Sequence, residues 1–231
     1  MGRIAATLAF VVALLFSAGS ARADFYDGLA AFDNGDYATA LEEWRPYAEQ
    51  GDAAAQAVIG TMYYEGRGVP VNYTGALKWF LKAAEQGYGK AQFQLGVMYA
   101  NGEGVPKNDA QAFNWYNKAA EQGNADAQDN LGLMYANGKG VPKNDAQAFN
   151  WFRKAAKQGN ADAQNNLGAM YAMGKGVPVN NVRAYMWLSL AKAQGHKGAA
   201  GNLDIIKEEI NTDQIGEAQE LATEMWKKIN N

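Results

Sequence analysis

The sequence repeats itself every 36 residues, and this constrains the fold more than any other feature. The stretch GVPKNDAQAFNW at positions 104–115 recurs unchanged at positions 140–151. Four further sets of identical residues share the 36-residue spacing: Gly60, Gly96, Gly132 and Gly168; Gly68, Gly104, Gly140 and Gly176; Pro70, Pro106, Pro142 and Pro178; and Trp79, Trp115, Trp151 and Trp187. Such a period predicts a solenoid of stacked units, which suits an extended binding surface better than a single catalytic site.

One unit shows why the repeat predicts helices. Asn124 follows a glycine and is placed to cap a first helix from about Ala125 to Ala136. The expected apolar stripe of this helix consists of Ala127, Leu131, Met134 and Tyr135. Gly132 interrupts the helix at a cost of about 1 kcal/mol relative to alanine. Because it recurs in every copy, we expect its missing side chain to let the partner helix come close.

The second helix of the unit follows a glycine-rich loop. Gly138 ends the first helix as a left-handed C-cap, and Pro142 prevents a new helix from starting before it. Asn144 or Asp145 then caps a helix that runs to about Lys157. Its expected buried stripe consists of Ala148, Phe149, Phe152, Ala155 and Ala156. Each unit is therefore predicted to be an antiparallel hairpin, and the chain an all-α solenoid.

Residues 1–23 have the pattern of a secretory signal. Arg3 precedes the thirteen-residue apolar run Ile4–Phe16, and Ala21-Arg22-Ala23 fits an A-x-A cleavage site before Asp24. The run is shorter than the roughly 20 residues of a membrane-spanning helix. An uncleaved anchor is the alternative. We expect an exported bacterial protein, periplasmic or secreted, cleaved between Ala23 and Asp24 and without stable membrane insertion afterwards.

The repeat divides the chain into seven segments. They are a signal peptide (1–23), an N-terminal tetratricopeptide-like capping unit (24–51), four repeats (52–87, 88–123, 124–159 and 160–195) and C-terminal capping helices (196–231). Pro46 stands within the second helix of the N-terminal unit, where we expect a kink or an early end. Thr212 is expected to cap the final helix, whose apolar face would include Ala218 and Trp226.

Charge and cysteine content exclude several classes of partner and site. The chain has 21 basic and 24 acidic residues, and residues 24–231 alone have 19 and 24, a net charge of −5. This balance disfavours nucleic acid, whose phosphates need a basic face. The chain has no cysteine, which excludes disulfides and thiolate metal sites.

The repeat resembles the Sel-one-like repeat, a relative of the tetratricopeptide repeat. The pattern A-x-x-x-L-G-x-M-Y-x-x-G-x-G-V-P, followed by A-(F/L)-x-W-(F/Y)-x-K-A-A-x-Q-G, stands nearly complete at 91–123 and 127–159 and with drift at 55–87 and 163–195. The resemblance implies a right-handed superhelix of helix pairs. It also implies adaptor or scaffold roles, with the first helices lining a concave groove for peptides or proteins. Some secreted members rich in cysteine are linked to β-lactam binding, and this chain lacks their cysteines.

No residues point to a catalytic, cofactor or metal site. Ser, His and acidic residues form no arrangement typical of an activated nucleophile. The single histidine, His196, occupies the entrance to a helix and is expected to be an exposed loop residue. The glycine-rich loops follow helices and not strands, which argues for turn chemistry and against a phosphate cradle. The protein is therefore predicted to be non-enzymatic and to need no cofactor.

Residues that vary on a constant frame are the weak candidates for partner contact. Phe93, Asp129 and Asn165 are equivalent in successive first helices, and so are Gln94, Asn130 and Asn166. The side-chain amides among them could hydrogen-bond a partner's backbone, and the alternative is a solvated helix face. The tryptophan ladder is expected to seal contacts between hairpins, with stacking on sugars as the alternative.

Our leading hypothesis is an exported scaffold or adaptor that binds protein or peptide partners on a helical-repeat surface. A cell-wall or carbohydrate-binding protein, which would use the tryptophans, is an alternative. A hydrolytic or β-lactam-interacting enzyme of the envelope is the third possibility, and it would require a cluster of residues that breaks the repeat.

Overall fold

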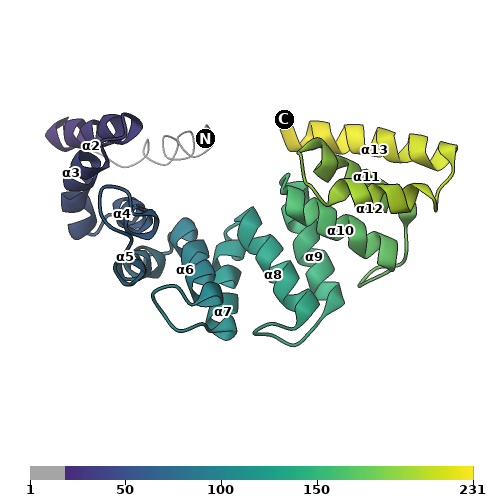
Figure 1. Cartoon of the computed structure of the whole chain (residues 1–231), viewed down its shortest axis with the longest axis horizontal. Coiled ribbons are helices and arrows are strands. Elements are labelled where there is room, and N and C mark those ends of the chain that lie inside the picture. Colours follow the sequence, from purple (N-terminus) through teal and green to yellow (C-terminus); the bar gives the residue numbers. More distant parts are fainter. Residues whose placement is uncertain (1–18, 231) are drawn as a thin grey trace. The chain divides into compact units, whose positions relative to one another are not determined.

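The computed structural model describes residues 19–230, and no strand occurs among them (Figure 1). Residues 1–18 and 231 lie outside the described part, and with them most of the predicted signal segment. The predicted cleavage position, Ala23–Asp24, falls within the helix α2 (Gly19–Asp33). The chain divides between Asn108 and Asp109 into two compact units, each with its own set of helices.

The described part consists of helices that follow the period of the sequence. The first unit contains α2, α3 (Tyr37–Glu49), α4 (Ala53–Glu65), α5 (Tyr73–Glu85) and α6 (Gly89–Asn101). The second contains α7 (Asp109–Glu121), α8 (Ala125–Asn137), α9 (Asp145–Lys157), α10 (Ala161–Met173), α11 (Asn181–Ala193), α12 (Ala199–Lys207) and α13 (Thr212–Asn230). Within the units α4 packs against α5, α8 against α9, and α10 against α11, so the predicted all-α hairpins are confirmed.

The repeat at α8 and α9 follows the sequence prediction closely. Asn124 caps α8, because its Oδ1 accepts a hydrogen bond from the backbone N–H of Ala127 over 2.8 Å. Gly138 ends the helix with a φ of 69°. Of the two residues that could cap α9, Asn144 does so, through a 3.0 Å bond from the N–H of Gln147.

The glycine inside each first helix brings the two helices of a hairpin into close contact. A Cβ atom placed on Gly132 would lie 2.5 Å from the ring of Phe152 on α9, which is shorter than any ordinary contact. Gly60 stands against Phe80 and Gly168 against Leu188 in the same way. The prediction that this glycine serves close packing is confirmed.

The second glycine of each loop joins a repeat to the preceding one. Gly176 has a φ of 69°, and a Cβ atom there would collide with the carbonyl of Asp145, the first residue of α9. Gly140 stands in the same relation to Asp109. Any other residue at such a position would have an unfavourable backbone φ, and its Cβ atom would clash with backbone atoms of the preceding repeat.

In the N-terminal unit α3 continues through Pro46 to Glu49, so of the two expected outcomes, a kink or an early end, the early end is wrong. Trp44 and Ala48, on either side of the proline, are both 1 % exposed. Burial of these side chains stabilises α3 and offsets part of the roughly 3 kcal/mol that an internal proline costs a helix. A Cβ atom on Gly28 would lie 2.6 Å from Trp44, so this first hairpin packs through a glycine as the later ones do.

The C-terminal helix α13 packs on α11. Met186 and Leu190 of α11 are buried, whereas the residues 36 positions earlier, Asn150 and Lys154 of α9, are exposed. The outer side of α11 is thus apolar where that of α9 is polar, which gives α13 a surface to cover.

Two expectations for α13 need correction. Asn211 and not Thr212 caps the helix, since Asn211 and Gln214 exchange hydrogen bonds of 3.0 Å between side chain and backbone N–H. A reciprocal box of this kind satisfies two N–H groups that would otherwise lack partners. Ala218 is buried as expected, but Trp226 is 41 % exposed.

Candidate interaction surface

A buried glutamine at the fourth position of the first helix links three helices. Gln128 of α8 donates through Nε2 to the carbonyl of Ala120 at the end of α7 over 3.1 Å, and its Oε1 accepts from Gln158 after α9 over 2.8 Å. Gln164 makes the same contacts with Ala156 and Gln194. The sequence prediction missed this framework, although the glutamine recurs every 36 residues. The side-chain amides of Gln128 and Gln164 hold neighbouring repeats together.

The predicted contact residues of α8 and α10 bond to one another across repeats. Asn166 donates through Nδ2 to Oδ1 of Asp129 over 3.1 Å, and Asn202 of α12 donates to Oδ1 of Asn165 over 2.9 Å. Asn130 instead bonds within α8, to the carbonyl of Asp126. One pair of polar side chains therefore links α8 to α10, and a second links α10 to α12.

The two remaining candidates, Phe93 and Gln94, lie on α6 in the first unit. Both side chains are half-buried. They are equivalent by spacing to Asp129 and Asn130 of α8, but belong to the other compact unit. The structure therefore brings together only the candidates on α8 and α10.

Asp129 is an unusual member of these pairs because it is a buried carboxyl group. Its surface is only 7 % exposed. Burial, with a smaller contribution from the nearby carboxylates of Asp162 and Asp126, raises the pKa of Asp129 to about 6, against the lowering effect of the bond from Asn166.

Carboxylates near the start of α8 and α10 accept bonds from the following repeat. Asn160 donates to Oδ1 of Asp126 over 2.8 Å, and Nε2 of His196 lies 3.3 Å from Oδ1 of Asp162. His196 also accepts the N–H of Ala199 through Nδ1 over 3.1 Å. His196 lies in the turn between α11 and α12, as predicted for a loop residue, but it is half-buried and not exposed.

One continuous side of these three helices is defined here as the α8–α12 face. It consists of Asp126, Asp129, Asn130, Leu133 and Asn137 of α8, Asp162, Asn165, Asn166, Ala169 and Met173 of α10, and Asn202, Ile205 and Glu209 of α12 and the turn after it. These positions share one side of each helix because they recur at intervals of three and four residues.

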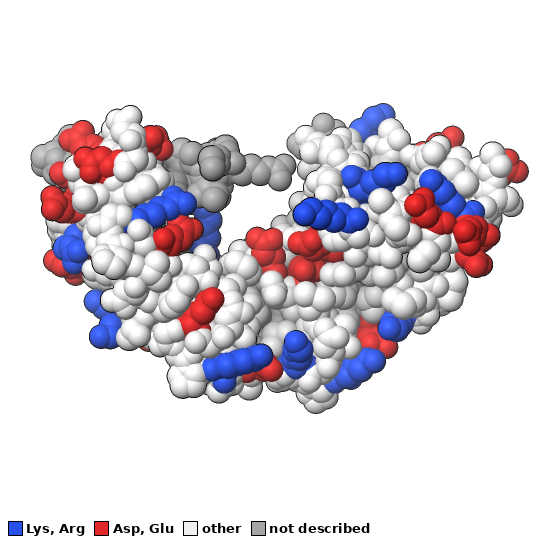
Figure 2. Space-filling view, in the orientation of Figure 1, with Lys and Arg blue, Asp and Glu red and all other residues white. Residues whose placement is uncertain are grey.

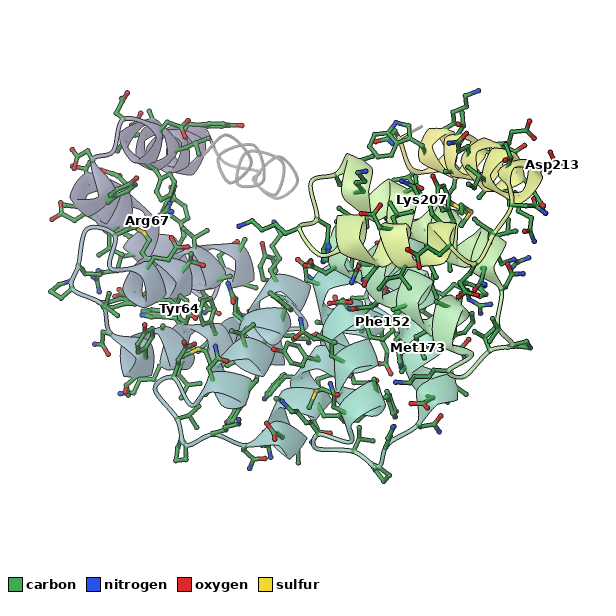
Figure 3. The ribbon with its side chains drawn as sticks, turned by 45° about the vertical axis from the view of Figure 1, so that its right-hand side comes forward. Tyr64, Arg67, Phe152, Met173, Lys207 and Asp213 are labelled. Atoms are coloured by element: carbon green, nitrogen blue, oxygen red, sulfur yellow. The ribbon has the colours of Figure 1, made fainter. Side chains whose placement is uncertain are left out.

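The α8–α12 face combines exposed apolar side chains with negative charge. Leu133 is 39 %, Met173 55 % and Ile205 63 % exposed; Figure 3 shows Met173 at the end of α10. The face holds four acidic residues and no lysine or arginine. Figure 2 shows carboxylates gathered near α8 on the visible side, with basic side chains beyond them toward the C-terminal helices.

Three tryptophans of the ladder lie half-buried beneath lysine side chains. The Nζ atoms of Lys82, Lys118 and Lys154 stand 4.5, 4.0 and 3.8 Å from the ring centroids of Trp79, Trp115 and Trp151. An ammonium over a ring face is a favourable cation–π contact, and it occupies one of the two faces of each ring on which a sugar could stack. Trp187 is buried, with 4 % exposed.

The variable residue of the glycine-rich loops contacts the preceding hairpin (Figure 3). The guanidinium of Arg67 lies 5.4 Å from the ring centroid of Phe32 and 5.5 Å from that of Tyr37. Glu103 accepts a 2.7 Å bond from the hydroxyl of Tyr64. In the first unit these loops therefore hold neighbouring hairpins together.

Residues 19–230 contain no group of three or more His, Cys, Asp or Glu side chains that could hold a metal ion. In the same part of the chain, no helix is both long and apolar enough to span a membrane.

Comparison with known proteins identifies the repeat. The Sel1 repeat family matches residues 53–88, 89–124, 125–160 and 161–196. No curated protein matches the chain.

Several solved structures are similar to the chain. A protective antigen of uropathogenic Escherichia coli with an SLR fold is 34 % identical, with a TM-score of 0.78, over 91 % of this chain and 45 % of its own. A Sel1 repeat protein from Oxalobacter formigenes is 40 % identical, with a TM-score of 0.68, over 74 % of this chain and 49 % of its own. The chain thus spans about half the length of these two proteins.

A third similar structure is described as a putative Sel1 repeat protein from Klebsiella pneumoniae. It is 26 % identical, with a TM-score of 0.52, over 82 % of this chain and 94 % of its own. The family match covers more than half of the chain, and the helices follow its period. The chain belongs to the Sel1 repeat family.

Proposed function

We propose that the protein is a non-enzymatic scaffold that binds a protein or peptide partner on the α8–α12 face. The observation that carries this proposal is the exposure of Leu133, Met173 and Ile205 beside polar side chains that are hydrogen-bonded in pairs across repeats. Exposed apolar side chains rimmed by polar groups are typical of interaction sites.

The repeat architecture supports the same role. Sel1 repeats commonly mediate protein–protein interactions, and stacked hairpins present their first helices as one extended surface. The polar side chains of α8, α10 and α12 are bonded in pairs across repeats, which holds the surface in one arrangement before a partner arrives. Such preorganisation lowers the entropic cost of binding.

Site-specific photo-cross-linking tests the proposal in cells that produce the protein. A benzophenone amino acid at Met173 is expected to give a discrete adduct with a partner protein. The matched control places it at Val179, which is 61 % exposed in the loop of the same repeat. Equal labelling from both positions, or no adduct from Leu133, Met173 or Ile205, would contradict the proposed role.

We also propose that the protein is exported and that Asp24 is the mature N-terminus. The proposal is supported by the apolar run Ile4–Phe16 and the Ala21-Arg22-Ala23 pattern. Fractionation of the cells and N-terminal sequencing test it. A chain recovered from the cytoplasm with residues 1–23 attached would overturn it.

A further inference from the structure

The α8–α12 face carries a charge pattern that favours one class of partner. Its four acids are Asp126, Asp129, Asp162 and Glu209, and no lysine or arginine lies among its thirteen residues. The side chain of Asp162 is 72 % exposed, and Asp126 is exposed as well. Lys197 borders the face, one residue beyond His196.

The apolar side chains form a second row beside these acids. Leu133, Ala169 and Ile205 are separated by 36 residues each, so they occupy the same position on α8, α10 and α12. The outer two are 39 % and 63 % exposed, while the small Ala169 between them is half-buried. Burying Leu133 and Ile205 under a partner would remove their exposed apolar surface from water, which favours binding.

The amide row lies next to this apolar row, because positions 130, 166 and 202 precede it by three residues on each helix. Asn166 and Asn202 each use one N–H of the amide in the bonds to Asp129 and Asn165. An asparagine amide has two N–H groups and an oxygen with two lone pairs. This row therefore has further capacity for hydrogen bonds to a partner's backbone.

We propose that the occupant of the α8–α12 face is a basic polypeptide segment in which lysine or arginine stands close to leucine-like side chains. The inference rests on the proposed scaffold function and specifies its partner. The basic groups face Asp126 and Asp162, and the apolar side chains lie between Leu133 and Ile205. Charge complementarity of this kind speeds association and excludes acidic partners.

Labelled model peptides test the charge and the apolar requirement separately. The probe is a fluorescein-labelled peptide of three Gly-Lys-Leu triplets, compared with peptides in which Glu replaces Lys or Ser replaces Leu. Fluorescence anisotropy at low salt is expected to show the Lys/Leu peptide binding at least about tenfold more tightly than either control. Raising the NaCl concentration to about 0.5 M is expected to weaken this binding, because exposed charges are screened.

Variants of the protein locate the binding. Asp126→Asn with Asp162→Asn is expected to weaken the Lys/Leu peptide about 5- to 20-fold, and Ile205→Ser about tenfold. The matched controls, Glu220→Gln with Glu224→Gln on α13 and Val179→Ser in a loop, are expected to change affinity less than about twofold. Lys197→Gln is expected to tighten binding. Circular dichroism and thermal unfolding establish that each variant is folded.

Three results would overturn the inference: equal or tighter binding of the Glu/Leu peptide, no binding of the Lys/Leu peptide at about 1 mM, or loss of affinity in the control variants as large as in the face variants. These results leave the proposed scaffold function standing if cross-linking at Met173 captures an acidic or neutral partner. If cross-linking fails but the Lys/Leu peptide binds selectively, the preference of the α8–α12 face for basic peptides stands and the scaffold role is overturned.

Discussion

Asn166 and Asp129 lie 37 residues apart and are joined by a 3.1 Å hydrogen bond from Nδ2 to Oδ1. The next such pair, Asn202 and Asn165, has the same spacing and a 2.9 Å bond, but its acceptor is neutral. The two pairs therefore differ by one buried negative charge, which makes the contribution of that charge measurable.

Asp129→Asn is expected to stabilise the protein at pH 7.5 by about 1–3 kcal/mol. The pKa of Asp129 is raised to about 6 in the folded chain, above the value of about 3.9 in an unfolded one. The favourable contribution of the protonated group is therefore fully present below about pH 4 and is lost as the pH rises through 6. An asparagine keeps an acceptor for Asn166 without the charge.

Urea unfolding between pH 4 and pH 8 measures this effect. The advantage of the variant is expected to shrink toward pH 4. Glu220→Gln on the exposed side of α13 serves as the control and is expected to change stability by less than about 0.5 kcal/mol. If the difference in unfolding free energy between Asp129→Asn and the parent protein stays the same from pH 4 to pH 8, the raised pKa of Asp129 is refuted.

Gly132→Ala is expected to destabilise the protein by about 1–3 kcal/mol, since the new Cβ atom would lie 2.5 Å from the ring of Phe152. The matched control is Gly201→Ala in α12, where a Cβ atom meets nothing within 4 Å. That change is expected to stabilise by about 0.5–1 kcal/mol through the higher helix propensity of alanine. Thermal unfolding of both variants checks the prediction, and two changes of the same sign would contradict it.

Gln128→Ala is expected to cost about 1–3 kcal/mol of unfolding free energy. It removes the bond to the carbonyl of Ala120 and leaves Gln158 without its acceptor on Gln128. Gln147→Ala, at an exposed position of α9, is the control and is expected to be nearly neutral. Chemical denaturation measures the unfolding free energy of both variants. Equal stability of the two variants would show that the buried glutamines contribute little.

Leu190→Lys is expected to release α13 from α11 and to destabilise the protein by about 3 kcal/mol. Leu190 is 3 % exposed, and a lysine stands at the equivalent position of the other three repeats. Limited proteolysis should then cut within α13 first. The reverse change on α9, Lys154→Leu, loses only the contact with Trp151 and should cost under about 1 kcal/mol. Resistance of α13 to protease in Leu190→Lys would count against the packing described.

Soluble chito-oligosaccharides are expected to leave tryptophan fluorescence unchanged. Lysine ammonium groups cover one face of Trp79, Trp115 and Trp151, and Trp187 is buried. The measurement uses Trp226→Phe, because Trp226 is 41 % exposed and would otherwise contribute a separate response. Saturable quenching by the sugars would revive the carbohydrate-binding alternative.

Local and periodic features of the chain were accessible to prediction. Asn124 and Gly138 mark the ends of α8 through short-range cap geometry. Gly132 recurs at every first helix, and so its role in close packing follows from the period. The helix cap was misplaced at Thr212 because the neighbouring Asn211 has similar capping strength. The length of α3 was misjudged at Pro46 because packing competed with the local preference of proline.

The sequence by itself determined the helices of each hairpin and the 36-residue spacing of the repeats, because helix caps and apolar stripes are local patterns that recur every 36 positions. Only the tertiary structure decided which polar residues are buried and which partner each one meets. Asp129 is buried and bonded to Asn166, whereas Asp162 remains exposed beside His196, although both are aspartates on first helices. The contacts that set them apart join side chains 34 to 37 residues away on the next hairpin, and their geometry depends on how successive hairpins pack.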